Sequence, residues 1–121
     1  MSKRVLVVED EEDNRRIVRD LLTSVGYEII EAVTGEEGVK AAETQLPDLI
    51  LMDIQLPGLD GYEATRRIRA NPALRKVPII VVTSYALSGD DVKAFEAGCD
   101  AYISKPFSPR VLLAKIREYL P

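Results

Sequence analysis

The chain has 121 residues, of which 46% are hydrophobic and 30% charged, as in one ordinary globular domain. Its 16 Lys and Arg against 20 Asp and Glu give a net charge of −4, which disfavours nucleic acid as the main partner. There is no histidine and a single cysteine, Cys99. These counts exclude Ser-His-Asp and Cys-His catalysis, His-ligated metals, an internal disulfide and a zinc–thiolate cluster.

Short apolar runs bounded by turn residues predict strands that are buried on both faces, as in a parallel sheet. The run from Leu49 to Met52 leads directly into the carboxylate of Asp53, and Pro57, Gly58 and Gly61 punctuate the loop beyond it. Five such strands are predicted, at residues 5–8, 27–32, 49–53, 78–83 and 101–104.

Between these runs the apolar residues recur with the period of a helix. In the first helix, which we expect to begin at Asn14 and stop at Gly26, the pattern assigns Ile17 and Leu21 to the buried face and Arg15 to the opposite face. The other four helices are expected from Thr34 to just before Pro47, over 62–70, over 88–97, and from Pro109 to Leu120 with Ser108 as the N-cap.

Five strands alternating with five helices predict an α/β fold, in which helices cover both faces of a parallel sheet. No linker, repeat or low-complexity stretch divides the chain. We therefore expect one domain over residues 1–121, with no output domain. The sequence also shows no long apolar run, signal peptide or lipidation signal, so we expect a cytoplasmic protein without membrane insertion.

Acidic residues follow two of the predicted strands. Glu9 and Asp10 come directly after the first strand, and Asp53 ends the third. If these strands are neighbours, the three carboxylates lie together and repel one another unless a hard cation such as Mg²⁺ neutralises them. Taken alone, however, the acidic run from Glu9 to Asp13 is better explained as an exposed, solvated loop.

Two further strand ends favour a chemical site. Thr83 ends the fourth strand with a hydroxyl, and Lys105 follows the fifth strand with an ammonium group. A carboxylate surrounded by a cation site, a hydroxyl donor and an ammonium group is suited to holding a phosphoryl group in transfer.

The ordered motifs resemble those of a response-regulator receiver domain of two-component signalling, over residues 3–120. The segments that carry the resemblance are V-V-E-D at 7–10, L-M-D-I-Q-L-P-G-L-D-G at 51–61, V-V-T-S at 81–84 and Y-I-S-K-P-F at 102–107. The resemblance implies a doubly wound (β/α)5, flavodoxin-like fold with strand order 2-1-3-4-5. The later segments are also similar to single-domain cell-cycle regulators of the DivK type, with chemotaxis regulators as the other single-domain candidate.

The resemblance implies roles for the residues at the sheet edge. Asp53 would accept a phosphoryl group from the phosphohistidine of a sensor kinase or histidine phosphotransfer protein. Glu9, Asp10, Asp53 and the backbone carbonyl of Gln55 would hold Mg²⁺. Lys105 would pair with the phosphoryl oxygens, beside a cis bond to the proline that follows it.

The resemblance also implies a switch. Thr83 and Tyr102 would move together on phosphorylation and change the face formed by helix four, strand five and helix five, to which a downstream protein binds. We expect a monomer or a phosphorylation-dependent dimer. Tyr85 is a candidate for shielding the phosphorylated state from water. The candidates for contacting the kinase, on the first helix, are Asn14, Arg15 and Val18.

Alternatives from other classes remain open at this point. Haloacid-dehalogenase-like phosphatases also place a nucleophilic Asp after a strand, but they carry a second Asp where this chain has Gln55. A nucleotide or flavin binder is compatible with the fold, although neither a G-x-G-x-x-G motif nor a P-loop is present. The chain could also be a receiver excised from a hybrid kinase, although its compact ends favour a natural short protein.

Overall fold

The computed structural model describes residues 2–83 and 90–120. The strands in these ranges are β1 (Arg4–Val8), β2 (Glu28–Ala32), β3 (Leu49–Asp53), β4 (Ile79–Thr83) and β5 (Ala101–Ser104). The helices are α1 (Glu12–Ser24), α2 (Gly35–Gln45), α3 (Gly61–Ala70), the 3₁₀ turn η1 (Pro72–Leu74), α4 (Asp90–Ala97) and α5 (Pro109–Tyr119).

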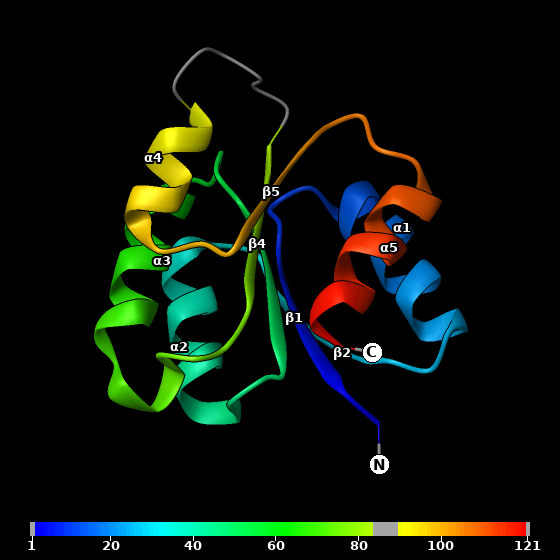
Figure 1. Ribbon diagram of the computed structural model, residues 1–121, viewed down its shortest axis with the longest axis horizontal. Coiled ribbons are helices and arrows are strands. Elements are labelled where there is room, and N and C mark those ends of the chain that lie inside the picture. Colours follow the sequence, from blue (N-terminus) through cyan, green and yellow to red (C-terminus); the bar gives the residue numbers. More distant parts are fainter. Residues whose placement is uncertain (1, 84–89, 121) are drawn as a thin grey trace.

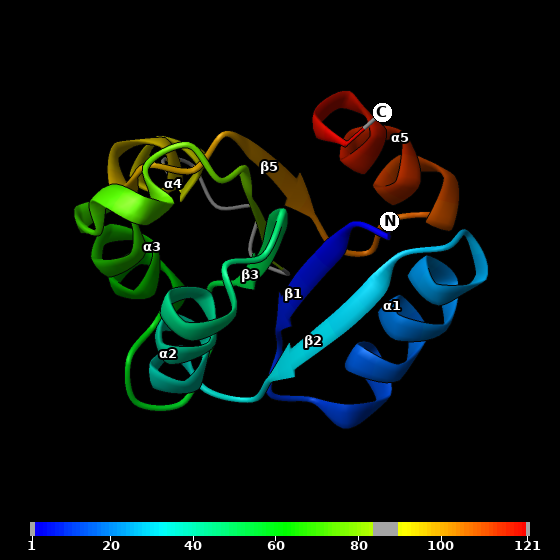
Figure 2. The same cartoon turned by 90° about the horizontal axis from the view of Figure 1, so that it is seen from below.

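The described strands form one parallel sheet in the order β2-β1-β3-β4-β5, which confirms the predicted flavodoxin-like topology. Helices α1 and α5 cover one face, and α2, α3 and α4 cover the other (Figures 1 and 2). The strand order reverses between β1 and β3, and a ligand site in a doubly wound sheet is expected at the carboxyl ends of these two strands.

The central strands are apolar because both of their faces are covered. Every residue of β3 and β4 is buried. Alternate residues of the sheet belong to separate cores: Met52 and Val81 pack in the core beneath α2–α4, whereas Leu51 and Val82 pack in the core beneath α1 and α5. These two cores hold the strand ends at fixed positions, which is what a site at the sheet edge requires.

In the described residues, side-chain caps begin three of the α-helices. Thr34, Asp60 and Ser108 each accept a hydrogen bond from the backbone N–H three residues further on, at the starts of α2, α3 and α5. The predicted Ser108 cap is therefore confirmed. Gly26, with φ of +97°, turns the chain out of α1 toward β2. Among the described residues, no helix has the length and apolar character needed to span a membrane.

Three details of α1 differ from the sequence-based expectation, and one detail of α4 lies outside the described residues. Helix α1 begins at Glu12, before the expected Asn14. Ile17 was expected in the core, but 60% of it is exposed because it borders an open groove toward α5. Arg15 was expected in solvent, but only 14% of its side chain is exposed because it folds back onto the β1–α1 loop and β2. The expected start of α4 at Ser88 lies outside the described residues.

Candidate functional site

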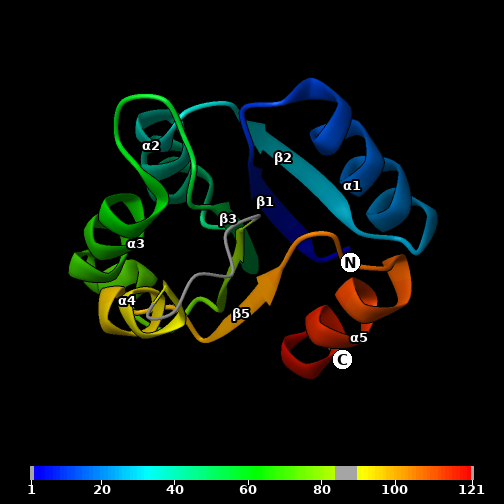
Figure 3. The same cartoon turned by 90° about the horizontal axis from the view of Figure 1, so that it is seen from above.

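The residues proposed from the sequence lie along the carboxyl edge of the sheet, which Figure 3 views from above. Asp53 and Thr83 are the last residues of β3 and β4. Glu9 directly follows β1, and Lys105 directly follows β5. Parallel strands end at the same edge, so the topology alone brings these four residues from distant parts of the sequence to one side of the molecule.

Three carboxylates converge at this edge. Glu9, Asp10 and Asp53 each offer an oxygen, and these oxygens lie within 4.8 Å of one another. Glu9 and Asp53 are 6% exposed, whereas Asp10 is exposed. Glu9 and Asp53 are therefore not solvated surface acids, whereas Asp10 to Asp13 are exposed, as expected of a solvated loop.

The backbone orients the two buried carboxylates. Glu9 Oε2 accepts a hydrogen bond of 3.2 Å from the N–H of Glu11, and Asp53 Oδ1 accepts one of 3.1 Å from the N–H of Gln55. One oxygen of each carboxylate is thus held by its own loop. The other oxygen, Glu9 Oε1 or Asp53 Oδ2, contacts Lys105.

Lys105 supplies the positive charge between the two buried acids. Its Nζ lies 2.6 Å from Glu9 Oε1 and 3.4 Å from Asp53 Oδ2. Burial alone would lower the pKa of the ammonium group, but the hydrogen bond that it donates to Glu9 and the charges of Asp53 and Glu9 outweigh this effect and raise the pKa above its usual value of 10.5. Lys105 is therefore positively charged at neutral pH. The peptide bond from Lys105 to Pro106 is cis, as the resemblance implied.

The carboxylate cluster fits a hard divalent cation. All of its potential ligand atoms are carboxylate oxygens, and two of the three carboxylates are buried. Among the described residues, one ammonium group, that of Lys105, forms ion pairs with these two buried carboxylates. Mg²⁺ prefers carboxylate, carbonyl and water oxygens and needs few protein ligands. Glu9, Asp10 and Asp53 are the residues that would hold it.

Thr83 and Tyr102 lie on the opposite face of the sheet from this cluster. Tyr102 pairs with Val81 in the β4–β5 register and packs against the core beneath α2–α4, to which Val81 belongs. Thr83, which is completely buried, follows Val81 by two residues and so has its side chain on that same face. The structure therefore places the two predicted switch residues on neighbouring strands and on one face.

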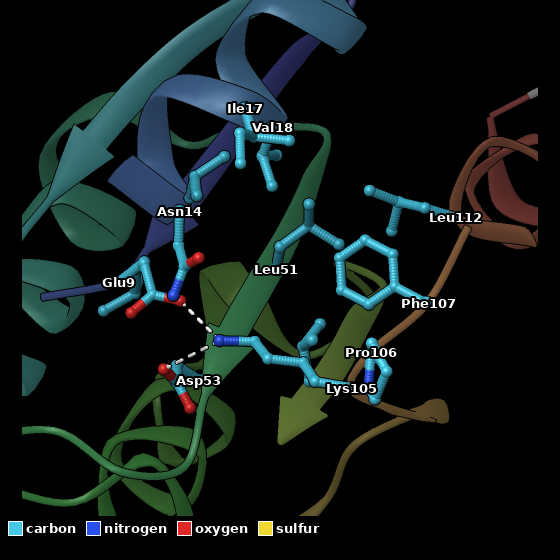
Figure 4. A pocket seen from close by; sticks show the side chains of 13 residues that line it. Glu9, Asn14, Ile17, Val18, Leu51, Asp53, Lys105, Pro106, Phe107 and Leu112 are labelled. Atoms are coloured by element: carbon cyan, nitrogen blue, oxygen red, sulfur yellow. Dashed lines mark hydrogen bonds and ion pairs between the residues drawn. The ribbon is translucent and has the colours of Figure 1, made fainter. Parts of the chain in front are cut away.

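A pocket of about 550 Å³ opens from the carboxylate cluster between α1 and α5. Figure 4 shows Glu9, Asp53 and Lys105 at its polar end. Leu51 forms the floor, with Ile17 and Val18 of α1 on one side and Phe107 and Leu112 on the other. A small polar end and apolar walls characterise a binding pocket, and here the polar end contains the candidate phosphoacceptor.

The first-helix candidates separate into two groups. Asn14 and Val18 line the pocket, as does Ile17, which the sequence pattern assigned to the core. Arg15 instead donates hydrogen bonds to the carbonyl oxygens of Glu9 and Asp10. The missed pocket residue Phe107 was visible in the sequence as the end of the Y-I-S-K-P-F segment. Tyr85 lies outside the described residues.

With this geometry established, the family of the chain is clear. The model of the response regulator receiver domain matches residues 5–117, and the chain belongs to this family of signalling proteins. The fold agrees with this assignment, since the strand order is the one that the sequence motifs implied.

Individual relatives support this assignment along the whole chain. The chain is 44% identical over 120 residues to the polar-differentiation response regulator DivK of Brucella ovis, covering 99% of this chain and 98% of that protein. A solved receiver domain of a sensor histidine kinase from Pseudomonas aeruginosa, with magnesium coordinated in its active-site cleft, is 40% identical with a TM-score of 0.92, and covers 99% of this chain and 98% of that chain. Vibrio cholerae CheY4 is 26% identical with a TM-score of 0.93, covering 98% and 99%.

Proposed function

We propose that Asp53 accepts a phosphoryl group from the phosphohistidine of a sensor kinase or histidine phosphotransfer protein. In this transfer a phosphorus–nitrogen bond breaks, a phosphorus–oxygen bond forms to an Asp53 carboxylate oxygen, and the imidazole leaves. The observation that carries the proposal is the position of Lys105, whose ammonium lies between the buried Glu9 and Asp53 carboxylates at the polar end of a pocket. The domain acts as a signalling switch rather than on an external metabolite.

The neighbours of Asp53 have complementary tasks. Glu9, Asp10, Asp53 and the Gln55 carbonyl would hold Mg²⁺, which when bound neutralises charge on the carboxylates and on the phosphoryl oxygens. Lys105 orients and balances the phosphoryl oxygens with its ammonium group, which remains charged throughout the physiological pH range. The Gln55 N–H, 3.1 Å from Asp53 Oδ1, holds the accepting carboxylate in one orientation. Cation chemistry and fixed geometry together favour in-line phosphoryl transfer.

The phosphoryl signal would reach the α4–β5–α5 face through Thr83 and Tyr102. A phosphoryl group on Asp53 adds charge and acceptor oxygens at the end of β3, one strand from Thr83. Movement of Thr83 on the α3–α4 side of the sheet changes the packing around Tyr102. Exposed apolar side chains at Val92 and Phe95 on α4 support this face as the binding surface for a downstream protein or a second copy.

The donor protein would dock at the mouth of the pocket. Ile17 is 60% exposed, and Val18 and Asn14 lie beside it at the pocket that leads to Asp53. An apolar helix face seated here would bring its phosphohistidine to the polar end. Arg15, the third first-helix candidate, would take part through the loop that it supports rather than by direct contact. The reaction would take place in the cytoplasm.

Transfer from a phosphorus–nitrogen bond tests the proposal. We expect the protein to take the phosphoryl group from phosphoramidate in the presence of Mg²⁺. The transfer is monitored by ³¹P NMR, as loss of the phosphoramidate signal and growth of an acyl-phosphate signal. The Asp53→Asn variant should show no acyl-phosphate signal, whereas Asp48→Asn, whose carboxylate binds the Arg4 backbone far from the site, should keep it. Equal signals from wild type and Asp53→Asn would refute the assignment of Asp53.

A further inference from the structure

The side chain of Arg15 is bound to the backbone of the loop that carries two of the candidate metal ligands. Its Nη1 donates to the carbonyl oxygen of Glu9 at 3.0 Å and to that of Asp10 at 3.2 Å. Only 14% of the side chain is exposed, so the guanidinium group is a part of the folded structure rather than a freely moving surface charge. These contacts involve backbone oxygens of Glu9 and Asp10 and not their carboxylates, which are the candidate cation ligands.

The other end of the guanidinium group is fixed to the sheet. Arg15 Nε donates to Glu31 Oε1 at 3.3 Å, and Glu31 lies in β2 directly beside Val7 of β1. Arg19, one turn further along α1, donates to both Glu31 oxygens at 3.2 Å. Arg15 therefore joins α1, the β1–α1 loop and β2 at one point, and Arg19 shares the last of these anchors without touching the loop.

The loop needs such an anchor for an electrostatic reason. Glu9 and Asp10 belong to a run of five acids, and like charges at this spacing favour conformations that move the carboxylates apart. The planar guanidinium group suits the task, since it donates several hydrogen bonds in fixed directions and remains charged. Two of these bonds hold the successive carbonyl groups of Glu9 and Asp10 toward α1.

We propose that Arg15 is a positioning residue for the divalent-cation site. By fixing the Glu9–Asp10 backbone against Glu31, it keeps the two carboxylates converging on Asp53, which increases the affinity of the site for Mg²⁺. The inference rests on the proposed function, because it assumes that these carboxylates bind Mg²⁺. It assigns to Arg15 a role distinct from contact with a donor protein.

The direction in which substitution of Arg15 changes the affinity for Mg²⁺ distinguishes a positioning role from a purely electrostatic one. A positive charge near the site repels a dication, so removal of the Arg15 charge would by itself strengthen Mg²⁺ binding. Loss of positioning would weaken binding instead. Residues that orient metal ligands typically change metal affinity by roughly 10- to 100-fold when substituted. Since Arg15 contacts backbone atoms of the ligand residues, we expect the lower end of this range.

The test is a Mg²⁺ titration of ¹⁵N-labelled protein, followed through its backbone amide resonances. Arg15→Met should bind Mg²⁺ roughly tenfold more weakly than wild type, and Arg15→Lys, which keeps the charge but not the planar fork, should lie between them. Arg19→Met is the matched control, because it loses bonds to Glu31 but none to the loop, and should remain close to wild type. Urea denaturation of each variant establishes that it is folded, and Glu31→Gln is a second probe that leaves Arg15 in place.

Each outcome is decisive. Unchanged or tighter Mg²⁺ binding by folded Arg15→Met and Arg15→Lys would overturn the positioning role while leaving the proposed function intact. Absence of Mg²⁺ binding by the wild-type protein, or binding that persists unchanged in Asp10→Asn, would instead overturn the proposed metal site. Weaker binding in Arg15→Met with near-normal binding in Arg19→Met would establish the role.

Discussion

Lys105 lies closer to Glu9 than to Asp53, with its Nζ 2.6 Å from Glu9 Oε1 and 3.4 Å from Asp53 Oδ2. One ammonium group thus balances two buried carboxylates that come from different strands. The longer reach of a Glu side chain, compared with that of an Asp at the same position, brings the Glu9 carboxylate to this contact. In the absence of a bound cation, Lys105 is the charge that makes the edge cluster stable.

Substitution of Lys105 should therefore destabilise the metal-free protein. In buffer with a chelator we expect Lys105→Met to lower the free energy of unfolding by about 1–3 kcal/mol, because Glu9 and Asp53 lose their counter-charge while largely buried. Lys115→Met is the control: Lys115 pairs with the exposed Glu118, and its loss should cost less than about 1 kcal/mol. Urea denaturation measures both values.

A second prediction concerns the stability of Lys105→Met in the presence of Mg²⁺. A cation that binds only the folded state stabilises it in proportion to its occupancy. Because Lys105→Met removes the competing ammonium group, Mg²⁺ should raise its free energy of unfolding more than that of wild type. An equal or smaller effect of Mg²⁺ on the variant would show that Lys105 and the cation do not share the same carboxylates.

Gly61 should be intolerant of any side chain. It begins α3, and a Cβ there would overlap the carbonyl group of Asp53 and lie only 2.7 Å from Ile54 Cα. Because these are backbone atoms they cannot swing away, and we expect Gly61→Ala to cost about 3 kcal/mol and to shift the amide resonances of Asp53 and Gln55. Gly26→Ala, which meets no atom within 4 Å but has φ of +97°, should cost only about 1–2 kcal/mol and leave those resonances in place. Similar costs and spectra for the two variants would contradict this account.

Much of the fold was predictable because the sequence carries strong local signals. The unbroken apolar runs that end in Asp53 and Thr83 predicted central strands buried on both faces, and both strands are entirely buried. The convergence of Glu9, Asp10 and Asp53 also followed from topology, since it needs only that β1 and β3 be neighbours. The exposure of individual residues on α1 was less predictable. The period of the apolar residues identifies one face of a helix, but it does not reveal where a neighbouring helix leaves that face uncovered. Ile17 is exposed for this reason.

Arg69 shows what a sequence pattern cannot reveal. Arg69 belongs to a basic stretch of the sequence at residues 66–76, yet only 18% of its side chain is exposed. It donates to the carbonyl oxygens of Gly98, Leu74, Arg75 and Val77 and pairs with Asp100 at 2.5 Å. These partners lie in η1 and in the loops before β4 and β5, and the local periodicity of the sequence does not reveal such pairing. Arg15 escaped prediction for the same reason.

Arg69 should consequently be important for stability. We expect Arg69→Met to lower the free energy of unfolding by about 2–4 kcal/mol, because several carbonyl groups and the Asp100 carboxylate lose their donor. Arg66, which pairs with the exposed Glu63 on the same helix, is the control, and Arg66→Met should change the free energy of unfolding by less than about 1 kcal/mol. Urea denaturation that placed the two variants at the same midpoint would contradict the role assigned to Arg69.

Cys99 should be unreactive in the folded protein. Burial, with a smaller contribution from the charge of Asp100, raises the pKa of the thiol from 9.0 to about 11. At pH 8 the thiolate fraction is thus about a hundredfold lower than in the unfolded chain, and the rate with a thiol reagent should fall at least in proportion. As this is the only cysteine, its rate is measured directly by absorbance, with protein in urea as the reference.

The raised pKa of the Cys99 thiol also determines how this group changes the free energy of unfolding with pH. Well below pH 9 the thiol is protonated in both states and contributes little pH dependence. As pH rises from 9 to about 11, the unfolded state releases the proton before the folded state does, so this group lowers the free energy of unfolding. Cys99→Ala should remove that contribution. Equal reactivity in native buffer and in urea would contradict the burial of the thiol.

The measurement that tests the central claim most directly is the intact mass of the protein after incubation with acetyl phosphate. It should be made on wild type and on Asp53→Asn, each with Mg²⁺ and with a chelator. We predict a single phosphoryl adduct on the wild-type protein that requires Mg²⁺ and is missing from Asp53→Asn. An adduct that persists in Asp53→Asn, or its absence from the wild type under every condition, would contradict the claim that Asp53 is a magnesium-dependent phosphoacceptor.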